Sequence, residues 1–370
     1  MLILILTKIQ QWTHNGFISS DVEFDSGLFD VSELEYNVKY VVPGFSDTHI
    51  HGISGFDTSD GIKDAVTGMA YELIKHGVSS FCPTTMTISK EKIFKCFEAV
   101  NEAAVELSQS SIPHAEILGI HLEGPFLNPD KCGVQDTKAC MLPSEGFNLI
   151  NSLEEKFPNL LKIIDIAPEL NGSEEFISEF KDKYFISAAH TSADYDTAFK
   201  AFGLGVKGVT HVLNAMNPFE KRVPGVLGAA IDYEKTYVEA ICDGIHLHPS
   251  VLKMVFAVIA DDKLVIVSDS MRGASMPDGK YLLGDTVVDV RGGRTYFGAK
   301  GDLAGSVTNM AEEVSVLKKC GIDAAKIIKA AAINPLLRID MKPDTRCINL
   351  LDENFYLMAT VFDGKIVSVN

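Results

Sequence analysis

The sequence lacks any C-x-x-C spacing, and its seven cysteines are scattered over 370 residues. A zinc ribbon, or the disulfide framework of a small secreted domain, needs paired and regularly spaced cysteines. The spacing therefore excludes both kinds of scaffold. We expect reduced thiols and a cytoplasmic protein.

Long apolar runs are also missing. No stretch reaches the ~18 consecutive apolar residues that a membrane-spanning helix requires. The opening apolar run, residues 1–6, has neither a basic flank nor a small-residue cleavage site. We expect a β-strand there, with no signal peptide and no membrane partner.

Basic residues are scarce. The chain has 33 Lys and Arg against 50 Asp and Glu, a formal net charge of −17 at pH 7. Such a charge repels nucleic acid and anionic membrane surfaces, which argues against both as partners. A small anionic ligand would need a locally placed cation.

Eight short apolar runs alternate with amphipathic stretches from residue 41 onward. The runs are residues 41–52, 79–86, 117–126, 161–169, 184–192, 206–216, 236–248 and 264–271. Between the first two, residues 63–77 carry apolar side chains at helical spacing and end at Gly77. Strand–helix alternation repeated eight times predicts an α/β fold, a (β/α)8 TIM barrel.

The two ends of the chain break this rhythm. Residues 1–42 and 342–370 are rich in strand patterns and turn signals, and we expect them to form one small β-sandwich domain. Residues 43–341 are then the barrel domain. Within it, residues 279–301 predict a hairpin-like insert around Gly292 and Gly293.

Polar side chains stand where the predicted strands end, which is where barrel enzymes place their reacting groups. They are His49, His51, Glu123, His190, His211 and Asp269. A lone histidine at a strand end is more often a packed core residue, but their joint occurrence favours a metal centre. His49 and His51 are two residues apart, so the strand period puts both on one face.

Histidine and carboxylate ligands suit a catalytic divalent ion, with Zn²⁺ first and Fe²⁺, Ni²⁺, Co²⁺ or Mn²⁺ as alternatives. Such an ion turns a bound water into a nucleophile near neutral pH. An aspartate beside it, here Asp269, can act as general base and then as general acid.

A second group of polar residues can hold an anion. Arg222 lies in a Pro/Gly turn, where its guanidinium can bind a phosphate bidentately with help from the Asn214 amide. A solvated surface arginine is the alternative interpretation. Asp243 and His246, in the seventh predicted strand, add polar groups to the same rim.

Five segments together resemble the N-acetylglucosamine-6-phosphate deacetylases of the amidohydrolase superfamily. They are residues 43–52 (PGFSDTHIHG), 121–126 (HLEGPF), 210–219 (THVLNAMNPF), 242–246 (CDGIH) and 267–271 (VSDSM). The likeness extends over about residues 43–335. Long matches at five separate strand ends make chance similarity a poor explanation.

The resemblance implies metal ligation by Glu123, His190 and His211, and a catalytic role for Asp269. It places substrate contacts at Asn214, Ala215, Arg222, His246, Leu303, Ala304 and Gly305. Family members that have the H-x-H pair can hold a second ion there, so we expect one or two ions per subunit. Members are commonly homodimers, and we expect a homodimer here.

One loop departs from the family pattern. A histidine usually follows the EGPF segment in a Gly-x-His context, whereas this chain has Gly133, Val134 and Gln135. We expect Gln135 to replace the histidine as a hydrogen-bond donor, with Val134 beside it at the substrate. Other superfamily members place a carboxylated lysine on strand four. Residues 166–169 (IAPE) contain none, so Glu123 is expected to bridge.

The implied reaction is the metal-dependent deacetylation of N-acetylglucosamine 6-phosphate to glucosamine 6-phosphate and acetate. The galactosamine epimer differs in one hydroxyl orientation and stays open as the alternative. The missing lysine and the arginine turn speak against a cyclic-amide hydrolase. The intact set of strand-end ligands speaks against a noncatalytic barrel that only binds sugar phosphates.

Overall fold

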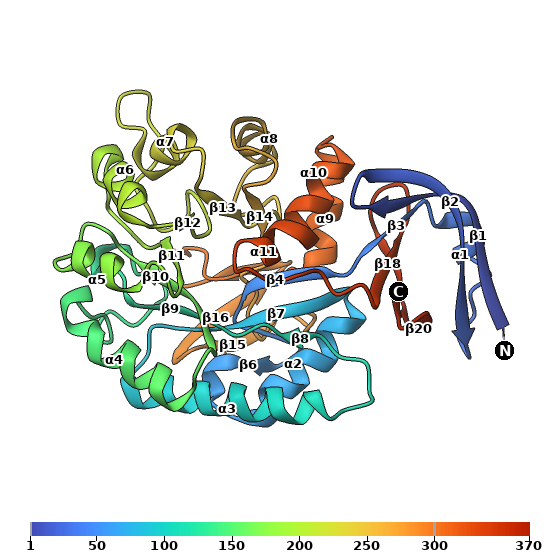
Figure 1. Cartoon of the computed structure of the whole chain (residues 1–370), viewed down its shortest axis with the longest axis horizontal. Coiled ribbons are helices and arrows are strands. Elements are labelled where there is room, and N and C mark those ends of the chain that lie inside the picture. The colour runs from blue at the N-terminus through green and yellow to red at the C-terminus, as the bar shows by residue number, and fades with distance from the viewer. Residues whose placement is uncertain (1, 299–300) are drawn as a thin grey trace.

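The computed structural model describes residues 2–298 and 301–370, and its largest part is a barrel of parallel strands (Figure 1). Eight strands follow one another in the order β14-β13-β12-β11-β10-β9-β7-β4. They are β4 (Phe45–Ile50), β7 (Val78–Thr85), β9 (Ile120–Phe126), β10 (Leu161–Ile166), β11 (Phe185–Ala188), β12 (Gly208–Val209), β13 (Tyr237–Ala240) and β14 (Leu264–Ile266). Each lies in or overlaps one of the eight predicted runs, so the prediction of an α/β barrel is confirmed.

The barrel closes just beyond the ends of its first and last strands. The Asp269 amide donates to the carbonyl of His49 at 2.9 Å, and the His51 amide donates to the carbonyl of Ser270 at 2.9 Å. These bonds join the segments that follow β4 and β14. Two predicted metal ligands and the predicted catalytic aspartate are thereby fixed to one another through the backbone.

Helices cover the outside of the barrel. They are α2 (Lys63–Lys75), α3 (Lys90–Ser108), α4 (Pro143–Lys156), α5 (Ser173–Phe180), α6 (Tyr195–Leu204), α7 (Gly225–Asp232), α8 (Pro249–Val258), α9 (Met310–Lys319), α10 (Ala324–Ile328) and α11 (Asn334–Leu337), with the short turns η1 (Thr58–Asp60), η2 (Pro129–Lys131) and η3 (Lys329–Ile333). Helix α2 shows how the apolar spacing in the sequence becomes a buried helix face. Val66, Met69, Ala70 and Leu73 are buried on one face, and Gly77 has a φ of 78° just past the end.

The two chain ends form a second, smaller barrel, at the right of Figure 1. Its strands are β1 (Leu2–Thr13), β2 (Gly16–Gly27), β3 (Tyr40–Pro43), β18 (Cys347–Leu351), β19 (Leu357–Phe362) and β20 (Lys365–Val369), and the short helix α1 (Leu34–Asn37) lies between β2 and β3. The predicted pairing of both ends is confirmed. The predicted β-sandwich is not, because the six strands close into one sheet in the order β1-β2-β20-β19-β18-β3.

Register shifts account for this closure. The pairing of β1 with β2 shifts between Leu6 and Ile9, and β1 then also pairs in parallel with β3 through Gln10 and Gln11. Such irregularities bend and twist a strand. A bent, 12-residue β1 therefore reaches both neighbours and closes the barrel.

The predicted insert is a three-stranded antiparallel sheet of β15 (Gly279–Leu283), β16 (Thr286–Arg291) and β17 (Arg294–Tyr296). Gly292 and Gly293 have φ of 57° and 74°, as the turn between β16 and β17 requires. The hairpin prediction is confirmed, although residues 299–300 of the predicted segment lie outside the described residues. Small pairings complete the fold: β8 (Glu116–Ile117) with β7, and β5 (Gly52–Ile53) with β6 (Phe56–Asp57).

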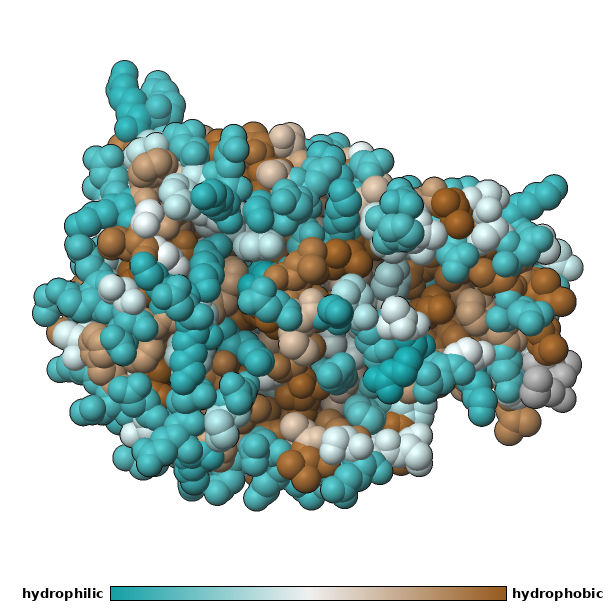
Figure 2. All heavy atoms as spheres, viewed as in Figure 1, coloured by the Kyte–Doolittle hydropathy of each residue, from teal (hydrophilic) through white to brown (hydrophobic). Residues whose placement is uncertain are grey.

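The surface of the large barrel is mostly hydrophilic in the view of Figure 2, while apolar patches gather over the small barrel at the right. Ile3, Ile5 and Ile18 of its first hairpin are about half exposed. Within residues 2–298 and 301–370, no helix is long and apolar enough to cross a membrane.

Candidate active site

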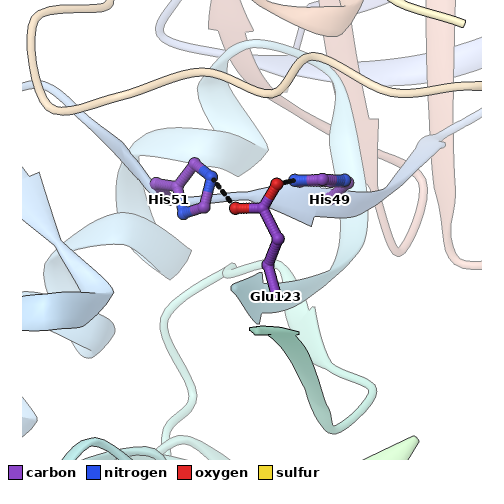
Figure 3. Close-up of side chains that lie close together, drawn as sticks. All are labelled: His49, His51 and Glu123. Atoms are coloured by element: carbon purple, nitrogen blue, oxygen red, sulfur yellow. Dashed lines mark ion pairs between the residues drawn. The ribbon is translucent and has the colours of Figure 1, made fainter. Parts of the chain in front are cut away.

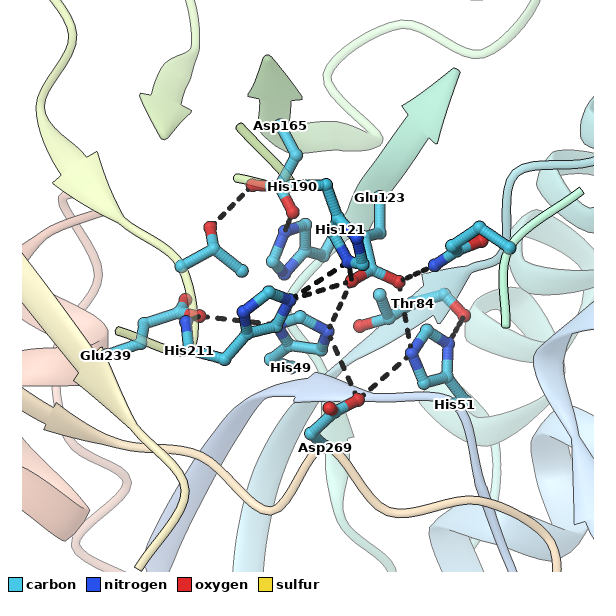
Figure 4. Close-up of polar contacts among 12 residues, drawn as sticks. His49, His51, Thr84, His121, Glu123, Asp165, His190, His211, Glu239 and Asp269 are labelled. Atoms are coloured by element: carbon cyan, nitrogen blue, oxygen red, sulfur yellow. Dashed lines mark hydrogen bonds and ion pairs between the residues drawn. The ribbon is translucent and has the colours of Figure 1, made fainter. Parts of the chain in front are cut away.

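Six predicted strand-end residues converge at the carboxyl end of the large barrel (Figure 4). His49 lies in β4 and Glu123 in β9, while the other four follow the ends of their strands: His51, His190, His211 and Asp269. All six are buried. Residues separated by as many as 220 positions in the sequence therefore lie together in one buried cluster, as the strand order of a barrel requires.

Glu123 stands at the centre of this cluster. Its Oε1 atom lies 3.0 Å from Nε2 of His190 and 3.2 Å from Nε2 of His211, and the two Nε2 atoms are 3.1 Å apart. Ligands held at about 2.0–2.1 Å from one ion are separated by similar distances, so this triangle has the size of a metal site. His190 is also oriented from behind, because its Nδ1 lies 2.8 Å from the carbonyl of Lys131.

His49 and His51 flank the same carboxylate, each facing one of its oxygens (Figure 3). His51 Nε2 lies 3.3 Å from Oε2 of Glu123, and His49 Nε2 lies 3.6 Å from Oε1. Their Nδ1 atoms are engaged elsewhere, with the carbonyl of Thr84 and the carboxylate of Glu239, both at 3.2 Å. Each ring therefore turns Nε2 toward Glu123, which lies between the two histidine pairs.

The donor set fits a divalent ion. His49 Nε2 is buried and has no hydrogen-bond partner among the residues that the structure describes, although it points at Glu123 and Asp269. Burial alone would raise the pKa of Glu123, but hydrogen bonds from His190, His211 and His51 hold it well below its usual range. A carboxylate kept charged among imidazoles is the arrangement that metal binding needs, because an ion replaces the imidazole protons when it binds.

Asp269 faces the histidine pair. Its Oδ1 atom lies 3.2 Å from Nε2 of His51 and 3.5 Å from Nε2 of His49. Burial raises the pKa of Asp269, but the charges of His49 and His51, with the His51 hydrogen bond, lower it below the usual value overall. The group is therefore a carboxylate at neutral pH, able to accept a proton.

Backbone conformation marks the same positions. His190, His211 and Asp269 have φ of 44°, 31° and 47°, in a region that non-glycine residues rarely occupy. Hydrogen bonds on both sides hold these turns, such as the Ser306 amide to the Asp269 carbonyl at 2.7 Å. Strained residues of this kind cluster at functional sites.

A buried ionic network supports the cluster from below, and its one local sign in the sequence is the charged Glu239 within the apolar run of β13. Glu239 of β13 accepts from His49, and its other oxygen lies 2.6 Å from the guanidinium of Arg338. Burial would raise the pKa of Glu239, but Arg338 and His49 hold it well below its usual range. His49, His121 and Glu239 also lie close enough to suggest a further ion site. The guanidinium of Arg338 already neutralises Glu239, so this group needs no ion to balance its charge.

Glu239→Gln should lower the free energy of unfolding by about 3–5 kcal/mol, because it leaves the Arg338 guanidinium buried without a counter-charge. Urea denaturation at neutral pH measures this. The control is Glu106→Gln, which breaks the exposed ion pair with Lys63 and should change the free energy of unfolding little, because solvent screens the pair. Equal, small losses in the two variants would contradict a supporting role for Glu239.

A cavity of about 340 Å³ opens onto this cluster. Most of the predicted substrate residues line it: Val134, Gln135, Asn214, Ala215, His246, Leu303, Ala304 and Gly305. Gly133 of the same loop lines it too, together with residues for which the sequence predicts no contact: Met86, Asp130, Lys131, Met216, Ile241 and Leu283. Among the described residues that line the cavity, Lys131 is the only lysine or arginine.

Two predicted substrate residues lie outside the lining. Arg222 is exposed, on the loop between β12 and α7, so its assignment to the phosphate stays a prediction. Asp243 lies behind His246, with Oδ2 at 2.7 Å from Nδ1 of the imidazole. Asp243 therefore orients His246 and has no place in the cavity wall.

Gln135 uses both ends of its side chain. The amide nitrogen donates to Oε2 of Glu123, and the amide oxygen accepts from the Thr87 backbone at 2.6 Å. The sequence predicted a donor to the substrate. The structure gives the residue a different partner, and one N–H of the same NH₂ group is left over for a substrate.

A buried set of histidines and carboxylates at the carboxyl end of a (β/α)8 barrel defines a metal-dependent hydrolase of the barrel type. The chain belongs to the amidohydrolase family, which matches residues 40–342.

It is similar to the N-acetylglucosamine-6-phosphate deacetylase of Bacillus subtilis (strain 168), at 39% identity over 274 residues, covering 74% of this chain and 68% of the relative. It is also similar to the N-acetylgalactosamine-6-phosphate deacetylase of Escherichia coli O157:H7, at 29% identity over 355 residues, covering 91% and 90%. The crystal structure of the N-acetylglucosamine-6-phosphate deacetylase of Thermotoga maritima superimposes with a TM-score of 0.83 at 28% identity, covering 99% of this chain and 100% of that one.

Proposed function

We propose that this protein hydrolyses N-acetylglucosamine 6-phosphate to glucosamine 6-phosphate and acetate. The observation that carries the proposal is the triangle of Glu123, His190 and His211, with Asp269 beside it, at the floor of one cavity. The shared family and the activity named for its relatives supply the reaction class.

Glu123, His190 and His211 would hold a divalent ion, which we propose to be Zn²⁺, with Fe²⁺, Ni²⁺, Co²⁺ or Mn²⁺ as alternatives. His49 and His51, with Glu123 between the two pairs, would hold a second ion if two are bound. When bound, the ion polarises the amide carbonyl and lowers the pKa of a water.

The residues of the chain divide the remaining work. Asp269 accepts the proton of the attacking water and returns it to the departing amine, since its carboxylate is charged and faces the ligand cluster. The free N–H of Gln135 is placed to donate to the substrate, and the Asp243–His246 pair fixes an imidazole at the cavity wall. These contacts hold the acetamide in one orientation.

We assign the substrate phosphate to Lys131, the one lysine or arginine among the described residues that line the cavity. Lys131→Ala should therefore raise KM for the phosphorylated sugar by roughly 10–100-fold, because it removes a charge-assisted contact with the phosphate of about 1.5–3 kcal/mol. The backbone carbonyl that orients His190 survives the substitution, so kcat should change little. The unphosphorylated sugar should show almost no loss. Steady-state kinetics on both sugars measure the difference, with the exposed Lys138→Ala on the same loop as the control.

Arg222→Ala belongs in the same assay. A selective loss on the phosphorylated sugar in this variant, with none in Lys131→Ala, would assign the phosphate to Arg222 and overturn the role of Lys131. If a variant loses as much activity on the unphosphorylated sugar as on the phosphorylated one, the residue that it changes does not bind the phosphate.

N-acetylgalactosamine 6-phosphate is the second candidate substrate. The relative from E. coli O157:H7, whose name carries that activity, aligns over nearly the whole chain. The two sugars differ only in one hydroxyl, so the same ligands and the same aspartate would serve both.

The proposal is tested by incubating the metal-loaded protein with three compounds: the N-acetylated sugar phosphate, its unphosphorylated form and a cyclic amide such as dihydroorotate. We expect acetate and a primary amine from the sugar phosphate, with no ring opening of the cyclic amide. Ring opening without acetate release would overturn the proposal. We further propose a homodimer, which sedimentation of the purified protein would test, and a cytoplasmic location, which cell fractionation would test.

A further inference from the structure

Two cysteine thiols lie in contact on the loop between β9 and α4. The Sγ atoms of Cys132 and Cys140 are 3.1 Å apart. Cys132 is buried and Cys140 is partly exposed, so small solutes can reach the pair from one side. Both are free thiols, as are the other five cysteines.

The same loop supports the metal site directly. The carbonyl of Lys131, next to Cys132, accepts from Nδ1 of His190, and the Gln135 side chain donates to Glu123. The backbone N–H of Gln135 in turn donates to the backbone carbonyl of Cys132 at 3.0 Å. A displacement of Cys132 therefore also moves Lys131, whose carbonyl orients His190, and Gln135, whose side chain donates to Glu123.

We propose that Cys132 and Cys140 are an oxidation site, and that a reversible disulfide between them displaces this loop and lowers turnover at the metal site. The two sulfurs need to approach by about 1 Å to reach the ~2.05 Å of a disulfide bond. The seven residues between the two cysteines form a short loop that can make this movement locally. Disulfides in cytosolic proteins are usually transient and regulatory, which suits a pair of this kind.

Hydrogen peroxide is the oxidant we propose. The Cys140 sulfur attacks one peroxide oxygen, the O–O bond breaks, and a sulfenic acid and water form. The Cys132 sulfur then attacks the Cys140 sulfur, the S–O bond breaks, and a disulfide and a second water form. Overall, two thiols lose two protons and two electrons to one peroxide. A hydrogen bond from Cys132 lowers the pKa of Cys140 despite its partial burial, which favours Cys140 as the attacking group.

The effect on activity follows from the distances. Misplacing a catalytic group by about 1 Å can cost roughly 10²-fold in rate, and the loop carries two groups that fix metal ligands. We expect the disulfide to lower kcat by roughly 10–100-fold and a dithiol reductant to restore it. This activity readout rests on the proposed deacetylase function, whereas formation of the disulfide does not.

The test treats Zn²⁺-loaded protein with hydrogen peroxide, maps the disulfide by peptide mass spectrometry without reduction, and measures acetate release before and after a dithiol. Zn²⁺ has no redox chemistry, so the ion itself is not oxidised. Cys140→Ser should keep its basal activity and resist peroxide. Cys320→Ser, which removes another partly exposed thiol, should behave as the unaltered protein does.

Three outcomes would overturn the inference. One is the absence of a Cys132–Cys140 cross-link after peroxide treatment. Another is a cross-link that leaves kcat unchanged. The third is an equal loss of activity in Cys140→Ser, which would place the damage elsewhere. If the protein releases no acetate at all, the proposed function fails while the peptide map still decides whether the oxidation site exists.

Discussion

Asp269→Asn should lower kcat by roughly 10²–10⁴-fold, the usual contribution of a general acid–base. The amide of asparagine cannot accept the proton of a water, while its shape nearly matches that of the carboxylate. Asparagine also tolerates the left-handed backbone that Asp269 adopts at φ 47°, so the fold should survive. Steady-state rates of acetate release, together with a thermal melt of the variant, measure the two effects separately.

The control for this variant is Asp285→Asn, which changes a largely exposed carboxylate in the turn between β15 and β16. It should leave kcat unchanged. Near-normal turnover in Asp269→Asn would mean that another group moves the proton. Loss of the melting transition would mean that Asp269 holds the structure instead.

Glu123→Gln should sharply lower the amount of metal that the protein binds. Both oxygens of Glu123 face histidine nitrogens, and a neutral amide is a poor ligand for a divalent cation. Loss of an orienting partner behind a ligand typically weakens metal binding by about 10–100-fold, and loss of the ligand itself should exceed that range. Elemental analysis after dialysis measures the bound metal, and acetate release should fall with it.

Glu313→Gln is a matched control, because Glu313, on helix α9, is also a fully buried glutamate. Burial raises the pKa of Glu313 well above its usual value, which favours the neutral acid that glutamine resembles. This variant should keep its metal. Full metal occupancy in Glu123→Gln would contradict the assignment of Glu123 as a ligand.

The sequence predicts the barrel well because each strand is a local pattern. Runs such as residues 161–169 are short, apolar and bounded by turns, and the structure has a strand in every one. Strand ends of a barrel meet at one rim, which is why the sequence predicts that His190, His211 and Asp269 lie together, as they do in the structure. The small domain was harder. Whether its strands form a sandwich or a closed barrel depends on register shifts in β1, which no local pattern records.

The residues that support the site could not be predicted from local sequence patterns, for a similar reason. Arg338 follows α11 and meets Glu239 only because the barrel brings the two segments together. A charged residue within the apolar run of β13 was the one sign available for Glu239. Lys131 carries no motif of its own, and only the cavity shows that it faces the site. Asp243 shows the same dependence on tertiary structure: its motif predicts a substrate contact, which stays a prediction, while the structure places its carboxylate against His246.

Acetate release from N-acetylglucosamine 6-phosphate and from N-acetylgalactosamine 6-phosphate, measured side by side on the Zn²⁺-loaded protein, tests the proposed deacetylase activity most directly. We expect turnover of the glucosamine derivative with a higher kcat/KM than that of its epimer, and no turnover of either by Asp269→Asn above the residual rate. Release of acetate from the galactosamine derivative alone would change the substrate and keep the mechanism. Absence of acetate from both sugars, with the metal in place, would contradict the proposed deacetylase activity.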